Sequence, residues 1–185
     1  MVAALLRNLD QTMRGITFVT SFLAGLMLIA CSSGPPRVEV CPIVSFVDGL
    51  ENVTVFGAKG GADLSNVLYA AEVTQLAATC VFNRKGATVS AEFLIITDRG
   101  LGDRERVARP DYFVVVTDPN GNVMAKEVFQ AEIPFNDNRR RVGRKEEIEP
   151  FLPYQGHNGD FTGYRVLIGF QLSPEQVAFN RRYRR

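Results

Sequence analysis

Beyond residue 41 the chain is dominated by short segments in which apolar and polar residues alternate, separated by turn residues. Alternation with a period of two is typical of strands that bury one face, and the segments are rich in β-branched and aromatic residues. Strands are predicted at 42–47, 52–56, 67–82, 88–97, 112–117, 123–133, 140–148 and 164–172.

Turn residues separate these strands. Arg84-Lys85-Gly86 and Asp118-Pro119-Asn120-Gly121-Asn122 each predict a hairpin turn, because Pro presets the backbone and Asn-Gly accepts the left-handed conformation. Loops are predicted at 57–61, 98–109 and 150–163. Ser173 as N-cap, Pro174 at the first position and Gln176 three residues after the cap predict a short C-terminal helix.

Many short strands with turns between them favour an all-β fold. We expect an antiparallel β-sandwich, immunoglobulin-like, with a short C-terminal helix. An α+β fold with an antiparallel sheet is the alternative.

The N-terminal segment has a different pattern. Arg7 and Arg14 precede an apolar run from Ile16 to Ala30, which is about as long as the core of a secretory signal and short for a membrane span. Its end, Leu28-Ile29-Ala30-Cys31, resembles the lipobox of bacterial lipoproteins. That resemblance implies cleavage before Cys31 and a lipid on its thiol. The alternative is an uncleaved anchor with an incidental cysteine.

The resemblance implies three regions: a signal peptide (1–30), a lipidated tether (31–40) and a periplasmic domain (41–185). Ser32 stands where an aspartate retains enterobacterial lipoproteins in the inner membrane, so we expect an outer-membrane protein facing the periplasm. The membrane would be a partner through the lipid on Cys31, and more than one acyl chain gives stable anchoring.

Cys41 and Cys80 remain after lipidation of Cys31. An even number of cysteines in an oxidising compartment predicts a disulfide. Its loop would stabilise the fold by roughly 3–4 kcal/mol, and it would join the first strand to the long strand that follows rather than join two sheets. A metal site is the alternative, but two cysteines and His157 make a poor ligand set.

Charge bears on the class of partner. The chain has 21 Lys and Arg against 20 Asp and Glu, and the signal contains Arg7, Arg14 and Asp10. The mature part is therefore neutral, which argues against a general nucleic-acid binder, since such proteins need a basic excess.

The basic C-terminus is the main candidate site. Arg181, Arg182, Arg184 and Arg185 surround Tyr183, with no acidic residue after them. Such a tail suits lipid phosphates or an acidic protein surface, and the alternative is a solvated terminus.

Other charged or glycine-rich segments have simpler interpretations. The mixed charges around Asp98, Asp103 and Glu105 indicate a surface whose charges compensate one another. The basic run from Arg139 to Lys145 indicates a charged strand at an exposed edge. Gly57–Gly61 lacks the Gly-Lys-Ser/Thr of a phosphate loop.

Four segments of the predicted domain resemble envelope lipoproteins of alphaproteobacteria. They are Cys-Pro at 41–42, Tyr-x-Ala-Glu-Val at 69–73, Ala-Lys-Glu-Val-Phe at 125–129 and Gly-Phe-Gln-Leu-Ser-Pro-Glu-Gln at 169–176. The resemblance implies a bacterial envelope protein and no particular activity.

We expect a non-catalytic envelope scaffold or accessory subunit that binds another envelope protein, with no cofactor, metal or nucleic acid. The second hypothesis is a periplasmic module that binds a glycan or lipid. The third is a hydrolase using His157 with Asp160, although no nucleophile motif accompanies them.

Overall fold

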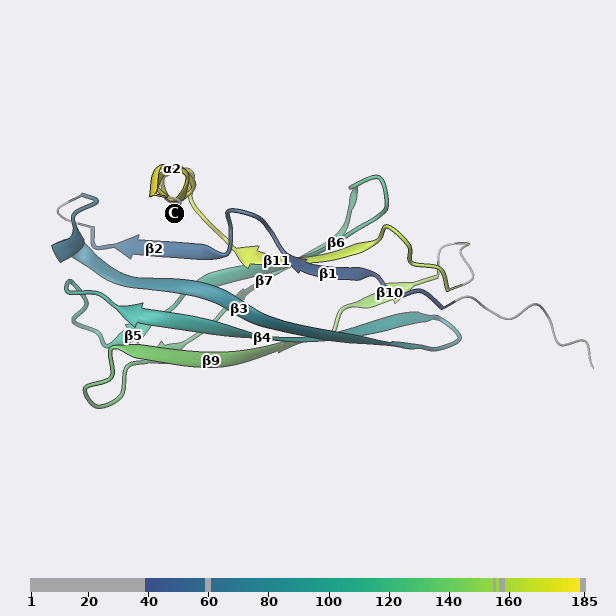
Figure 1. Ribbon diagram of the computed structural model, residues 1–185, viewed down its shortest axis with the longest axis horizontal. Helices are drawn as coiled ribbons and strands as arrows, with labels where there is room; N and C mark the ends of the chain where they lie inside the picture. The colour runs from purple at the N-terminus through teal and green to yellow at the C-terminus, as the bar shows by residue number, and fades with distance from the viewer. Residues whose placement is uncertain (1–38, 59–60, 155, 157–158, 184–185) are drawn as a thin grey trace, which may run out of the picture. The chain divides into compact units, whose positions relative to one another are not determined.

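Two large β-sheets and one two-stranded sheet form the described part of the domain (Figure 1). The computed structural model describes residues 39–58, 61–154, 156 and 159–183. The first sheet has the order β1-β11-β6-β7, with bounds Ile43–Phe46, Arg165–Phe170, Asp111–Thr117 and Val123–Gln130. Its first pair, β1 with β11, is parallel, and the other two pairs are antiparallel.

The second sheet is built on a long hairpin of β3 (Val67–Phe82) and β4 (Gly86–Arg99). Strand β2 (Asn52–Phe56) pairs with the far side of β3. On the other side of β4 lie β9 (Arg141–Ile148) and β10 (Phe151–Pro153), which pair with successive parts of that strand. All of these pairs are antiparallel, so the second sheet matches the expected pattern.

Four further elements complete the described part of the fold. Strands β5 (Val107–Ala108) and β8 (Ile133–Pro134) form a two-stranded ladder, and a 3-10 helix, η1, spans Leu64–Asn66. Helix α2 spans Pro174–Tyr183. The Ser173 amide donates to Gln176 Oε1 at 2.8 Å, and the Gln176 amide donates back to Ser173 Oγ at 3.3 Å. The predicted capping box is therefore confirmed.

The core lies between the two sheets and is made of side chains from both. The ring of Phe93 on β4 packs edge-on against Phe46 of β1, with centroids 6.1 Å apart, and against Tyr112 of β6 at 5.5 Å. Phe93 is 1% exposed. These contacts between sheets confirm the all-β sandwich with its short C-terminal helix.

Both predicted hairpin turns are confirmed. Asn83 Oδ1 accepts from the amides of Lys85 and Gly86 between β3 and β4. In the other turn Asp118 Oδ1 accepts from the amides of Asn120 and Asn122, while Gly121 has φ +85°. Glycine suits that position because a Cβ would be strained there.

The disulfide Cys41–Cys80 is present, with 6.1 Å between the two Cα atoms. It joins the first strand region to β3, as predicted. The expectation that it would not join two sheets was wrong. Strand β1 pairs in parallel with β11 in the first sheet, whereas Cys80 lies on β3 in the second. The bond therefore links the segment directly before β1 of the first sheet to β3 of the second sheet.

The structure corrects three loop or strand boundaries. The predicted loop 98–109 contains the end of β4 and all of β5, and the loop 150–163 contains β10. The single strand predicted at 123–133 is two, because β7 ends at Gln130 and β8 pairs with β5. Each short strand exists through a partner distant in sequence, which local pattern does not reveal.

Candidate functional site

Several predicted site residues lie outside the described part of the chain. They are Cys31 with its lipobox, His157, Arg184 and Arg185. Arg181 and Arg182 lie in the last turn of α2. Arg181 also lines a groove of about 600 Å³ between α2 and the segment 48–54. The structure thus places two of the four arginines on the helix, and one of them beside a concavity.

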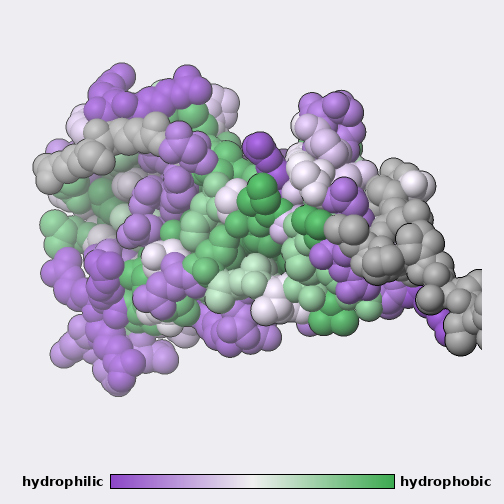
Figure 2. All heavy atoms as spheres, turned by 45° about the vertical axis from the view of Figure 1, so that its right-hand side comes forward, coloured by the Kyte–Doolittle hydropathy of each residue, from purple (hydrophilic) through white to green (hydrophobic). Residues whose placement is uncertain are grey.

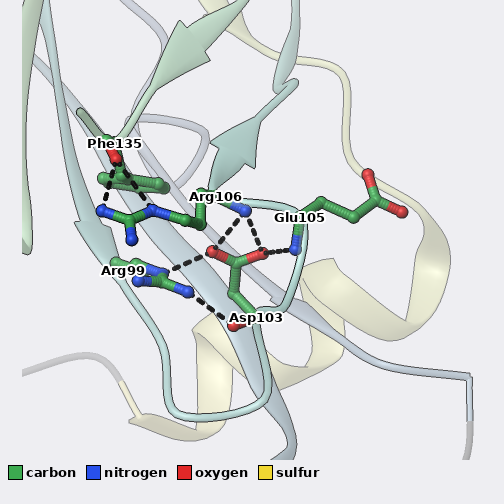
Figure 3. A network of polar contacts seen from close by, with 5 residues as sticks. All are labelled: Arg99, Asp103, Glu105, Arg106 and Phe135. Atoms are coloured by element: carbon green, nitrogen blue, oxygen red, sulfur yellow. Dashed lines mark hydrogen bonds and ion pairs between the residues drawn. The ribbon is translucent and has the colours of Figure 1, made fainter. Parts of the chain in front are cut away.

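A network of polar contacts surrounds Asp103 in the loop between β4 and β5 (Figure 3). Its carboxylate accepts from Arg99 Nε at 2.6 Å and from the amides of Glu105 and Arg106 at 2.9 and 3.1 Å. The Arg106 guanidinium donates to the carbonyl oxygen of Phe135 at 3.2 Å. Asp103 is 9% exposed, and its charge is compensated locally. This network holds the loop and confirms the self-compensating interpretation.

The lateral edges of the sheets differ in how they are covered. At the β2 edge, Asn180 of α2 donates to the carbonyl oxygen of Asn52 at 2.7 Å. The β9 edge carries charged side chains, with Arg141 bonded to Asp98 at 2.9 Å and Lys145 Nζ to Glu92 at 2.8 Å. This confirms the expected charged edge strand, a pattern that discourages pairing between edges. Strand β1 has only four residues.

Strand β7 is the other edge of the first sheet, and it is eight residues long. The hydrogen bonds around the β6–β7 pair show which backbone groups of β7 point away from β6. The Asp111 carbonyl accepts from the Gln171 amide, so Asp111 directs its backbone toward β11, and the Ala131 amide donates to Pro110 across the β6–β7 pair. Hydrogen-bonding direction alternates along a strand. Lys126 and Val128 therefore direct their N–H and C=O groups away from the sheet.

Exposed large apolar residues are unevenly distributed. In the view of Figure 2, hydrophobic residues gather in an uneven patch across the middle, and hydrophilic residues gather toward the left end. Val123 and Val128 of β7 are 64% and 54% exposed, and Phe151 of β10 is 47% exposed. Val128 shares the outer face of the first sheet with Lys126, whereas Phe151 pairs with Thr88 in the second sheet.

A cleft of about 310 Å³ is lined by residues of both sheets, and we call it the β7 cleft. Its apolar lining includes Val114, Phe129, Ile148 and Phe151. Behind it the Tyr112 ring stacks on Phe129, with centroids 5.2 Å apart. The cleft exists because β9 and β10 leave the inner side of β7 partly uncovered.

Three glutamates border the β7 cleft: Glu127, Glu147 and Glu149. The Glu147 carboxylate binds Lys145 on the outer face of the second sheet, where Glu147 pairs with Glu92, and the Glu149 carboxylate accepts from Ser90 Oγ on that same face. Lys126 also lines it, but its ammonium is 3.0 Å from Gln171 Oε1 and 4.9 Å from the centroid of the Phe113 ring. Register pairs Lys126 with Val115 and Glu127 with Val114, so successive β7 side chains point to opposite faces. The lysine charge therefore lies on the outer face of the sheet, and Glu127 is the charged side chain that β7 directs toward the cleft.

A buried polar contact supports the floor of the cleft. The Tyr112 hydroxyl donates to Glu146 Oε2 at 3.0 Å, and Glu146 also forms an ion pair with Arg144. Burial, with a smaller contribution from the charge of Glu146, raises the pKa of Tyr112 well above its usual range. The hydroxyl therefore stays protonated at neutral pH and acts as a hydrogen-bond donor.

The arrangement suits binding: an exposed strand edge with outward-pointing amides, next to a partly apolar cleft that Glu127 borders. Within the described residues no group of three or more His, Cys, Asp or Glu side chains is placed to hold a metal ion. Likewise, no described helix is long and apolar enough to cross a membrane. The sequence indicated exposed strand edges in general but not which edge. The exposed valines of β7 indicate a binding edge only when the strands that lie beside β7 are known.

No protein-family model, curated protein or solved structure matches this chain.

Proposed function

We propose that this protein is a lipid-anchored outer-membrane lipoprotein that acts as a non-catalytic envelope scaffold or accessory subunit. It binds an extended segment of another envelope protein by adding that segment as a strand to β7. The observation that carries the proposal is the β7 edge, where Lys126 and Val128 direct backbone groups outward and Val128 is 54% exposed. Strand addition to a free edge is a common mode of peptide recognition.

The anchor and the compartment rest on the sequence. The Leu28-Ile29-Ala30-Cys31 motif lies outside the described residues. The Cys41–Cys80 disulfide supports an oxidising compartment, since such bonds are rare in the cytosol. A membrane anchor would hold the domain near partners in the same membrane, and a high local concentration compensates for a small interface.

A proline at position 128 tests the edge. The Val128 amide points away from β6, so Val128→Pro removes an outward donor while leaving the β6–β7 ladder in place. Val128→Thr keeps the amide and the β-branched shape, and serves as the matched control. We expect both variants to fold, because an edge strand tolerates proline whose N–H would face solvent.

The assay is site-specific photo-crosslinking of the full chain in intact cells. A photo-reactive residue at position 123, on β7, should form a discrete adduct with one envelope protein. The same residue at position 81, which is 67% exposed on β3, should not. The adduct should persist with Val128→Thr and disappear with Val128→Pro. An adduct unaffected by the proline would rule out strand addition at β7.

The groove beside α2 favours one alternative, a module that binds a glycan or lipid. Phe179 packs against Phe56 and Tyr183, with centroids 5.2 and 4.6 Å apart, and Tyr183 is 60% exposed. An exposed ring beside Arg181 is suited to stacking on a sugar or contacting a headgroup. A soluble glycan or lipid that raises the Tm of the parent, but not of a Tyr183→Ala variant, would favour this alternative.

A further inference from the structure

We propose that the segment docking on β7 carries a lysine or arginine that enters the β7 cleft, with its charge against Glu127 and its aliphatic stem against Phe129. This inference rests on the proposed function, because the cleft becomes a specificity pocket only when a strand lies beside β7. It adds the chemical class of the partner: an extended segment with a basic residue between β-branched or apolar residues.

Geometry brings the docked residue to the cleft. A strand added beside β7 would lie about 4.8 Å away, with directly opposite Cβ atoms about 5 Å apart. Side chains of Ala125, Glu127 and Phe129 face the inner side, because their register partners Val116, Val114 and Tyr112 belong to the core between the sheets. The docked residue opposite Glu127 therefore points into the cleft.

Charge selects a cation there. Among the described residues no ion pair engages Glu127, whereas Glu147 lies 3.0 Å from Lys145 Nζ and Glu149 accepts from Ser90 Oγ at 3.3 Å. The nearest basic side chain along β7, Lys126, is held on the opposite face. An acidic residue entering the cleft would meet like charge, which is destabilising between directly opposite positions.

The apolar lining favours a long stem over a short cation. The ring of Phe129 is half-buried and lies on the inner face next to Glu127, so it presents apolar surface to the cleft, which Val114 and Ile148 also line. Lysine and arginine cover such surface with their methylene groups while the charge stays near solvent. The guanidinium of arginine also stacks on aromatic faces, so both basic residues fit.

A peptide selection identifies the preferred residue. A random decapeptide library displayed on phage is selected on the purified full-length protein in detergent, and peptides that still bind Val128→Pro are discarded. The remaining peptides depend on the edge. We expect them to be enriched in Lys or Arg at one position flanked by β-branched residues. A selected peptide is then titrated by fluorescence anisotropy, alongside a version with Leu at the enriched position.

Matched variants assign the preference to the cleft. Glu127→Gln should weaken binding of the selected basic peptide about two- to fivefold, as expected for a partly exposed ion pair. It should leave the Leu version unchanged. Glu72→Gln removes an exposed carboxylate from β3 and should have no effect. Equal binding of the basic peptide to the parent and to Glu127→Gln would overturn the inference.

The outcomes separate the inference from the function on which it rests. Edge-dependent peptides without an enriched basic residue would overturn the specificity while leaving strand addition at β7 standing. A selection without edge-dependent peptides would overturn both. A dimer of the parent that dissociates with Val128→Pro, seen by light scattering, would identify a second copy as the occupant and also overturn the inference.

Discussion

Breaking the Cys41–Cys80 disulfide should destabilise the domain by an amount that the structure allows to be worked out. The two cysteines are 39 residues apart in sequence, and closing a loop of that length stabilises a fold by about 4 kcal/mol through the entropy of the unfolded chain. The bond also joins the two sheets, so its loss removes a link that hydrogen bonds between neighbouring strands cannot replace.

Urea denaturation of the full-length protein in detergent, with and without reductant, measures this effect. With a denaturant dependence of about 2 kcal/mol per M, the unfolding midpoint should fall by about 2 M on reduction. The double variant Cys41→Ala/Cys80→Ala is the control. It should unfold near the reduced midpoint and should not respond to reductant.

The loss of stability on reduction of the disulfide should be greatest at β1. The amides of Ile43, in β1, and of Val47, directly after it, donate to the carbonyls of Tyr164 and Ile168 at 3.0 and 2.9 Å, and β1 is a four-residue edge strand. Hydrogen exchange at these amides should accelerate on reduction more than exchange in β4. An unchanged midpoint, or equal acceleration throughout the domain, would refute the argument that the bond secures β1 to the second sheet.

Two further predictions concern the core. Phe93→Ala removes a buried ring between the sheets and should lower the free energy of unfolding by about 3–5 kcal/mol in urea titrations; a loss below about 1 kcal/mol would contradict the packing described. Burial raises the pKa of Tyr69 from 10.0 to about 12. The folded state therefore holds this proton more tightly than the unfolded chain. Its contribution to stability is complete below pH 10 and is lost between pH 10 and 12, at about 1.4 kcal/mol per pH unit. Tyr69→Phe should reduce this change in the free energy of unfolding per pH unit. An equal change in the variant and the parent would show that Tyr69 does not cause it.

The sequence predicted those features whose cause is local. Alternation located the long strands, and β3 has the predicted bounds 67–82. The turn at 118–122 and the capping box at Ser173 also follow from side chains that bond to backbone a few residues away. Because each partner lies within a few residues, the chain segment itself contains the information.

Features that depend on distant partners required the tertiary structure. The two-residue strand β5 exists only through β8, and the disulfide links the sheets only because β1 pairs with β11 near the other end of the chain. The candidate site has the same origin. Val128 and Glu127 look like an ordinary alternating pair in the sequence, and only the order of strands leaves the outer edge of β7 unpaired beside a cleft. Local pattern determines which segments are strands, whereas pairing and sheet stacking, which depend on the whole chain at once, decide which strand edge is free to bind.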